Sequence, residues 1–503
     1  MVQDLQAMTR FRDLVIIIAG RALLITCSLI TLRLFTSVLL PEEVGRASVI
    51  SSSISWFVLL LVSPVDNYIY RRAVEWCAEG TLLRNLLRNF ATYLAVVAVV
   101  AVSLLLLLNR CMAESMSLSI PSLIFLSIGY ILVREWVWQP VMVLNIMGHR
   151  LGYVALMNGA TWIGLAFSIL LVHWRGPRAE YWLSGPVLAH LALLTVSLPV
   201  FLRVGSRTPA STAGDQVHTS HWLAIRGVFD FSWPQIIYGV LYWLQTQSYR
   251  FILAENADLI TVGLFATGFS LGMMPTLMFD QLFNEFYTPL FYQAISNSSK
   301  QEQVRAWNEM ASAYFPALIL VGAFAAVSGP FLARFLVGER FQGVGWLSLW
   351  GALAVCGAQA STAIGMAGRA RMNTRILVWP NLCGAVVAVS GVAVLSRWSP
   401  LGGTGLALAL ATATSAVLIM LQVRRLLPVQ FPWRRIGLAT LISLPLVATI
   451  AVIRTICVPP NMTVSLIVLV AGGSYLLAAQ FSLARPWLKI PLPASFAGVL
   501  TET

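Results

Sequence analysis

The chain has 503 residues, of which 58% are hydrophobic and only 11% are charged. An ordinary soluble domain carries about 25% charged residues, so this composition excludes a soluble fold, a disordered chain, a collagen-like repeat and a disulfide scaffold. The net charge of +13 would suggest nucleic-acid binding in a soluble protein. Because no basic run or polar domain carries that charge, we predict no nucleic-acid partner.

The cysteines give no sign of a metal or redox centre. They are scattered along the chain without a C-x-x-C spacing, so we predict that they serve as small apolar packing residues and that no metal is bound. They are Cys27, Cys77, Cys111, Cys356, Cys383 and Cys457.

Apolar stretches of about 20 residues, long enough to cross a bilayer, recur throughout the chain. They predict an all-α polytopic membrane protein with about fourteen transmembrane helices. The predicted spans are 14–40, 47–69, 89–108, 119–144, 153–173, 182–202, 229–252, 261–288, 311–335, 344–366, 376–396, 403–423, 436–456 and 462–484. The first span is too long for a signal peptide and carries arginines within it, so we expect none.

Basic residues alternate between the connections of these spans. Most lie in the even-numbered connections and the two tails, and a minority lie in the odd-numbered ones. The positive-inside rule then predicts that both termini are cytoplasmic. Four arginines remain within spans, namely Arg21, Arg33, Arg134 and Arg250.

The two halves of the chain share landmarks in the same order. Arg33 precedes Gly45 and Arg250 precedes Gly263 at nearly equal spacing, and GHR near residue 148 corresponds to GRAR near residue 368. We therefore predict two six-helix lobes in a pseudo-twofold repeat. The predicted domains are an N-terminal lobe at 1–202, a cytoplasmic linker at 203–227, a C-terminal lobe at 228–427, and two additional helices with a tail at 428–503.

Ionisable residues inside the membrane are costly, so they usually face a cavity or a partner. The guanidinium group binds phosphate in a bidentate manner and stays charged, so Arg21, Arg33 and Arg250 predict binding of an anionic phosphate or pyrophosphate group. Snorkelling to the interface is the alternative for Arg33 and Arg250.

Other intramembrane charges are candidates for cavity or ion-coupling roles. Asp66 either faces a cavity or caps the end of its helix, and Asp280 and Glu285 share a helix face only loosely. Arg134 and Glu135 are adjacent, so they are expected to face different directions and serve structural interfaces. His190 is expected to be a hydrogen-bonded core residue.

Several segments together resemble the Wzx-type polysaccharide flippases of the multidrug/oligosaccharidyl-lipid/polysaccharide exporter superfamily. The resemblance covers most of the chain, and it rests on the order and spacing of five strings. They are LRLFTSVLLPEEVGRASVI, YWLQTQSYRFILAENADLITVGLFATGFSL, FYTPLFYQAIS, GMAGRARMNTRILVWPNLCGAVVAVSGVAVL and PLGGTGLALALATATS.

This resemblance implies a flippase that moves an undecaprenyl-pyrophosphate-linked oligosaccharide to the periplasmic leaflet by alternating access through a cationic central cavity. It also implies the bacterial inner (cytoplasmic) membrane, contact with membrane lipids, a polysaccharide polymerase and export machinery as partners, and a role in exopolysaccharide or lipopolysaccharide synthesis. Arg33 and Arg250 match the family positions best. We expect no cofactor, although Na⁺ or H⁺ could serve as a coupling ion.

Two alternatives remain open at this stage. A multidrug or cation antiporter of the same superfamily would need an acidic cavity. The intramembrane arginines make such a cavity less favourable. A membrane-embedded polysaccharide-processing enzyme usually needs a long extracytoplasmic loop or a catalytic His/Asp set, whereas the odd-numbered connections are short and hold only His173 among histidines. We therefore expect a transporter without enzymatic activity.

Overall fold

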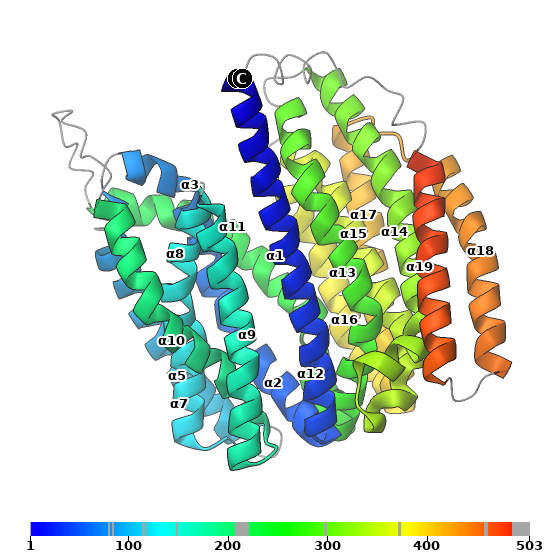
Figure 1. Cartoon of the computed structure of the whole chain (residues 1–503), viewed down its shortest axis with the longest axis horizontal. Helices are drawn as coiled ribbons and strands as arrows, with labels where there is room; N and C mark the ends of the chain where they lie inside the picture. The colour runs from blue at the N-terminus through cyan, green and yellow to red at the C-terminus, as the bar shows by residue number, and fades with distance from the viewer. Residues whose placement is uncertain are drawn as a thin grey trace. The chain divides into compact units, whose positions relative to one another are not determined.

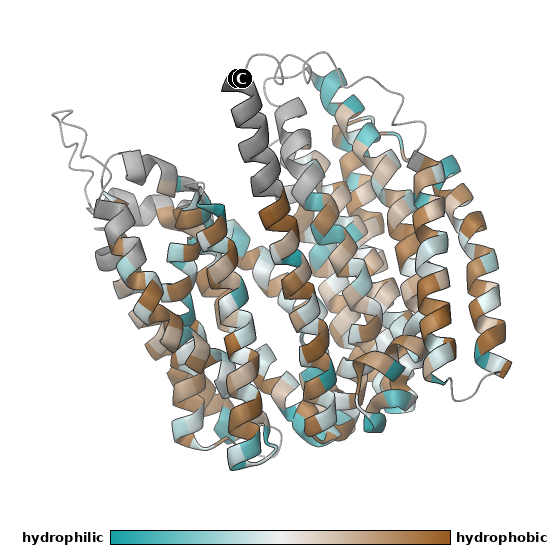
Figure 2. Ribbon diagram, viewed as in Figure 1, coloured by the Kyte–Doolittle hydropathy of each residue, from teal (hydrophilic) through white to brown (hydrophobic). Residues whose placement is uncertain are grey.

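The computed structural model describes residues 2–78, 81–82, 85–112, 116, 118–146, 149–206, 221–295, 299–370, 374–456 and 461–484. Within these ranges every regular element is a helix (Figure 1). Among the described residues, 13 helical segments are long and apolar enough to cross a membrane. Hydrophobic residues extend along most of their length (Figure 2). The predicted all-α polytopic fold is therefore confirmed, and the chain is a multi-pass membrane protein.

The chain divides into two compact units, Val2–Trp243 and Leu244–Thr503. The boundary falls inside one helix, α11. The predicted linker at 203–227 lies largely outside the described residues, because α10 ends at Ser206 and α11 begins at His221.

The first unit is built from long helices, and its described residues include three π-helical turns, η1, η2 and η3. The elements are α1 (Val2–Val38), α2 (Pro41–Phe57), η1 (Val58–Val62), α3 (Ser63–Ala78), η2 (Asn85–Phe90), α5 (Ala91–Cys111), α7 (Ile120–Ile128), η3 (Gly129–Val133), α8 (Arg134–Ile146), α9 (Arg150–Arg175), α10 (Ala179–Ser206) and α11 (His221–Thr246). The helix from α2 continues through η1 into α3, and that from α7 continues through η3 into α8.

Local sequence explains where several of these helices begin and end. Pro41 opens α2, where a missing N–H costs nothing, and Glu42 and Glu43 follow in its first turn, where the helix dipole favours negative charge. Ser119 caps α7 by accepting a hydrogen bond from the Ser122 N–H. Gly176 ends α9 with a φ of 106°, a conformation that glycine adopts most readily.

Most of α11 packs within the first unit. The Trp243 indole N–H donates to the Ser52 carbonyl at 3.0 Å, and the Asn67 amide donates to Gln235 Oε1 at 3.0 Å. The sequence-based division placed the start of the second lobe at residue 228, whereas these contacts keep the helix with the first unit as far as Trp243. The difference arises because a span was assigned by its order in the repeat rather than by its packing.

The second unit contains the remaining helices. They are α12 (Tyr249–Asn256), α13 (Leu259–Ile295), α14 (Lys300–Leu336), η4 (Glu339–Leu347), α15 (Ser348–Ala370), η5 (Thr374–Leu377), α16 (Val378–Trp398), α17 (Pro400–Leu426), α18 (Trp433–Ile456) and α19 (Met462–Ala484). The last two lie beside each other (Figure 1) and both pack on α14. A capping box of Ser299 and Glu302 starts α14.

Helix pairing inside each unit follows the same order. In the first unit α1 packs on α9, which pairs with α10, and in the second α12 packs on α16, which pairs with α17. Each first helix is joined to the next by two residues, 39–40 and 257–258. A buried asparagine lies on the corresponding helix of each unit, Asn158 on α9 and Asn381 on α16. This agreement matches the repeat that the sequence predicts.

Glycines allow α13 and α15 to approach closely in the second unit. A Cβ on Gly272 would lie 1.9 Å from the Ser348 carbonyl oxygen, and one on Gly351 would lie 2.0 Å from the Phe269 carbonyl oxygen. Membrane helices lack a hydrophobic drive toward each other and gain much of their association from close packing between small residues. This contact therefore holds α13 and α15 together.

Replacing Gly272 by alanine should destabilise the protein, because the new methyl group meets backbone that cannot move aside without displacing a helix. Overpacking of this kind costs about 1–3 kcal/mol. We expect a lower apparent Tm in detergent, measured by size-exclusion chromatography after heating. Gly437→Ala on α18 is the matched control, since no atom lies within 4 Å of the added Cβ. An unchanged Tm for Gly272→Ala would contradict the assigned packing.

Candidate functional site

Two of the predicted anion-binding arginines lie on α1 in the first unit. Arg21 and Arg33 are both half-buried, and both interact with other groups of the protein. Because an α-helix rises 1.5 Å per residue, their Cα atoms are about 18 Å apart along the helix axis. They therefore lie at two different depths of the same helix.

The third arginine, Arg250, lies at the start of the short helix α12. The turn at Gln247 and Ser248 separates α11 from α12. The guanidinium lies 4.6 Å from the ring centroid of Tyr249, and its Nη1 donates to Gln247 Oε1. Its Nε is buried and donates to no described residue. Arg250 is thus a positioned cation with donor capacity that the fold does not use.

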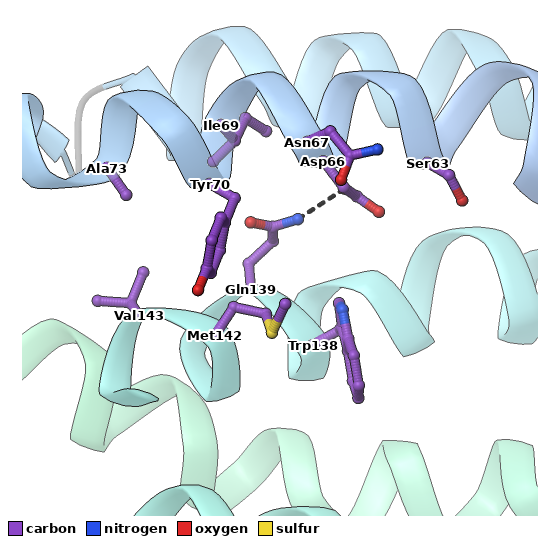
Figure 3. A pocket seen from close by; sticks show the side chains of 10 residues that line it. All are labelled: Ser63, Asp66, Asn67, Ile69, Tyr70, Ala73, Trp138, Gln139, Met142 and Val143. Atoms are coloured by element: carbon purple, nitrogen blue, oxygen red, sulfur yellow. Dashed lines mark hydrogen bonds between the residues drawn. The ribbon is translucent and has the colours of Figure 1, made fainter. Parts of the chain in front are cut away.

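The candidate carboxylate Asp66 lies inside a continuous helix and therefore does not cap a helix end. Gln139 on α8 donates from Nε2 to Asp66 Oδ1 at 2.7 Å (Figure 3). Glu135 lies one helical turn before Gln139 on the same face of α8, which places its carboxyl on the side of the helix that meets Asp66. Asp66 and Gln139 both line a pocket within the first unit.

This pocket lies between α3 and α8 and has a volume of about 260 Å³. Its polar side chains project from successive turns of α3 and face Gln139 across the space (Figure 3). The lining residues are Ser63, Asp66, Asn67, Ile69, Tyr70, Ala73, Trp138, Gln139, Met142 and Val143. The lining is mostly apolar, and its polar groups, Asp66 and Gln139 among them, make the pocket a candidate site for water.

Arg134 does not act as an isolated cation. Its Nη1 lies 3.0 Å from Glu135 Oε1, and its guanidinium lies 5.8 Å from the Trp138 ring centroid. The expected structural role of the two residues includes this ion pair with each other, which the sequence analysis did not foresee. The side chains do differ in burial, with exposed fractions of 32% and 1%, but the long arginine side chain bends back to reach the buried carboxylate.

In the second unit, Asp280 on α13 is buried among aromatic side chains. The Tyr314 hydroxyl on α14 donates to Asp280 Oδ1 at 2.5 Å. Phe279 and Phe283 pack against the same tyrosine ring. The other candidate on this helix, Glu285, has a side chain outside the described residues.

Sequence reasoning missed the partners that define these sites. Gln139 was not considered, although it follows Glu135 by one helical turn and so shares its face. Arg134 and Glu135 were both assigned to structural interfaces, because adjacent residues face different directions on a helix. A search for polar pairs four residues apart inside the fourth span would have found both residues. In the part of the chain that the structure describes, no group of three or more His, Cys, Asp or Glu residues could hold a metal ion.

Comparison with known families gives one match. Residues 215–344, which include Arg250 and Asp280, match the model of a family described as polysaccharide biosynthesis protein. No curated protein sequence matches the chain.

Two solved structures share the fold over most of their length. One is "Lipid II flippase MurJ, inward closed conformation", with a TM-score of 0.66 and 11% sequence identity, covering 95% of this chain and 100% of that one. The other is an inward-facing multidrug resistance MATE family transporter of the MOP superfamily, with a TM-score of 0.59 and 14% identity, covering 80% of this chain and 94% of that one.

At these identities the two structures establish the fold, and the family model adds a sequence match in the middle of the chain. The fold is therefore the one expected from the resemblance that the sequence showed, and the family match over residues 215–344 agrees with it.

Proposed function

We propose that the protein is a flippase that moves an undecaprenyl-pyrophosphate-linked oligosaccharide from the cytoplasmic to the periplasmic leaflet of the bacterial inner membrane. It would work by alternating access through a cationic cavity, driven by Na⁺ or H⁺, and would act without enzymatic chemistry. The match to the polysaccharide biosynthesis family and the fold shared with a structure titled as a lipid II flippase both support this proposal.

The observation that carries the proposal is the state of Arg250. A charged group inside the membrane is expensive unless a partner compensates it, yet the buried Nε of Arg250 donates to no described residue. Tyr249 and Gln247 hold the guanidinium in place without neutralising its charge. A diphosphate would supply the missing negative charge and accept bidentate hydrogen bonds. An organic cation would instead be repelled.

Arg21 and Arg33 extend this binding role to two depths on α1. Because about 18 Å separates their positions along the helix, they suit successive contacts with a moving head group better than one shared contact. The polyprenyl tail would stay in the lipid during transfer. A polysaccharide polymerase or export complex would then receive the oligosaccharide.

Removing Arg250 should abolish transfer. In a strain lacking the protein, lipid-linked oligosaccharide should accumulate on the cytoplasmic leaflet, and Arg250→Ala should fail to restore surface polysaccharide. Arg250→Lys keeps the charge but loses the planar fork, so partial rescue is expected. In purified protein, farnesyl pyrophosphate serves as a short polyprenyl probe. Its Kd should rise roughly 10- to 100-fold in Arg250→Ala, as loss of charge-assisted hydrogen bonds implies.

The matched control is Arg397→Ala, which removes an exposed arginine from the last turn of α16. It should bind the probe and rescue the strain as wild type does. Normal surface polysaccharide in the null strain, together with altered drug resistance, would overturn the flippase proposal in favour of an antiporter.

The proposed orientation, with both termini in the cytoplasm, places Cys111 on the periplasmic side. Cys111 ends α5 and is exposed. With the other cysteines replaced, a membrane-impermeant maleimide should label it in cells whose outer membrane has been permeabilised. Lys300→Cys in a cysteine-free background, at the exposed start of α14, should be labelled only after the inner membrane is opened. The reverse pattern would invert the topology.

A further inference from the structure

The cluster between α3 and α8 brings two carboxyl groups together. Gln139 donates to Asp66 Oδ1 at 2.7 Å, and Glu135 lies one helical turn before Gln139 on the same face of α8. Two ionised carboxylates offer only acceptors, so a direct bond between them needs a proton on one of them. No N–H or hydroxyl of the described residues donates to Glu135 Oε2, although the Glu135 side chain is only 1% exposed.

The charge balance of the cluster also favours a bound proton. Arg134 compensates one carboxylate through its contact with Glu135 Oε1 at 3.0 Å. Two ionised carboxylates and one guanidinium would leave a net charge of −1 inside a membrane-spanning unit, where an uncompensated charge is strongly disfavoured. A single added proton makes the cluster neutral.

The pocket gives this proton a route. Asp66 lines the cavity of about 260 Å³, whereas Glu135 is not among its lining residues (Figure 3). A water molecule occupies about 30 Å³ in the liquid, so several waters fit against Asp66. Asp66 therefore lies between a hydrated space and the buried Glu135, in the position of the group that exchanges the proton.

Three other titratable groups lie near the pair. The hydroxyls of Tyr93 on α5 and Tyr130 on η3 donate to the carbonyls of Leu61 and Leu183. His190 on α10 lies within electrostatic reach of Arg134.

The helices on both sides of the pair carry irregular turns. The π-helical turn η1 directly precedes α3, and η3 directly precedes Arg134 and Glu135. Turns of this kind are often found at functional sites and interrupt the regular hydrogen bonding of a helix. They give each helix a place to adjust when the contact between them changes.

We propose that Asp66 and Glu135 form a proton-binding site in the first unit, in which one proton is shared between the two carboxyls and exchanged through the pocket. The inference rests on the proposed function only in assigning this proton as the coupling ion. A metal cation fits less well, because the guanidinium of Arg134 contacts Glu135 directly and would repel it.

Infrared difference spectroscopy of the purified protein tests the site without any transport assay. Between pH 5 and pH 9 we expect a carboxylic-acid C=O band that titrates and shifts in D₂O. The band should be lost in both Asp66→Asn and Glu135→Gln, which remove one carboxyl from each helix. Glu42→Gln, an exposed residue paired with Arg46, and His190→Gln should both retain it.

Two results would overturn the proposal. One is a band that persists in both carboxyl variants while they remain monodisperse in size-exclusion chromatography. The other is displacement of the band by sodium chloride but not by choline chloride, which would make this a metal-cation site.

A separate measurement distinguishes this site from the proposed function. Asp66→Asn and Glu135→Gln should bind farnesyl pyrophosphate as wild type does, yet lose the acceleration of transfer by a proton gradient in proteoliposomes. If the wild-type protein transfers no lipid while the band behaves as expected, the flippase proposal fails and the proton site stands. If acceleration persists in both variants, the proton does not couple here.

Discussion

Compensation of buried charge is the constraint that organises this protein. An ionised side chain within the hydrocarbon region must find an opposite charge, a hydrogen-bond donor or water. Arg134 and Glu135 compensate each other, and Asp66 receives a donor from Gln139. Asp280 receives one from Tyr314. Each of these partners except Arg134 lies on a different helix from the carboxylate that it serves, so polar contacts also fix which helices are neighbours.

Close packing of the backbone makes such contacts possible. Where α13 meets α15, glycines remove the side chains that would keep the helices apart. Where α3 meets α8, the helices leave a pocket instead, and π-helical turns lie directly before both of them. The second unit thus gains rigidity along this contact, whereas the first unit keeps space for water beside charged groups. Both arrangements follow from local sequence: small residues in one case and polar ones in the other.

The sequence was sufficient to predict the helices, because the length and apolarity of each span reflect the thickness of the bilayer directly. Each predicted span corresponds to a helical segment, although the seventh is divided between α11 and α12. The partners of the charges were harder to predict. Hydropathy reports that Asp66 is buried in an apolar segment but carries no information on which helix faces it. The pairing of Arg134 with Glu135 was missed because backbone direction was taken to fix where a long side chain ends.

The two carboxylates on the second helix of each repeat show how one architecture can hold different chemistry. The Tyr314 hydroxyl donates its proton to Asp280, so this hydrogen bond needs no group from outside the protein. At Asp66 and Glu135 the proposed shared proton must come from outside the protein, because both groups are carboxyls. A bond that supplies its own donor is suited to holding α13 and α14 together. A contact that depends on a bound proton changes with pH, and Asp66 lines a pocket through which protons can reach it. The substitution of a carboxyl for a phenol as partner is therefore enough to turn a structural contact into one that responds to its surroundings.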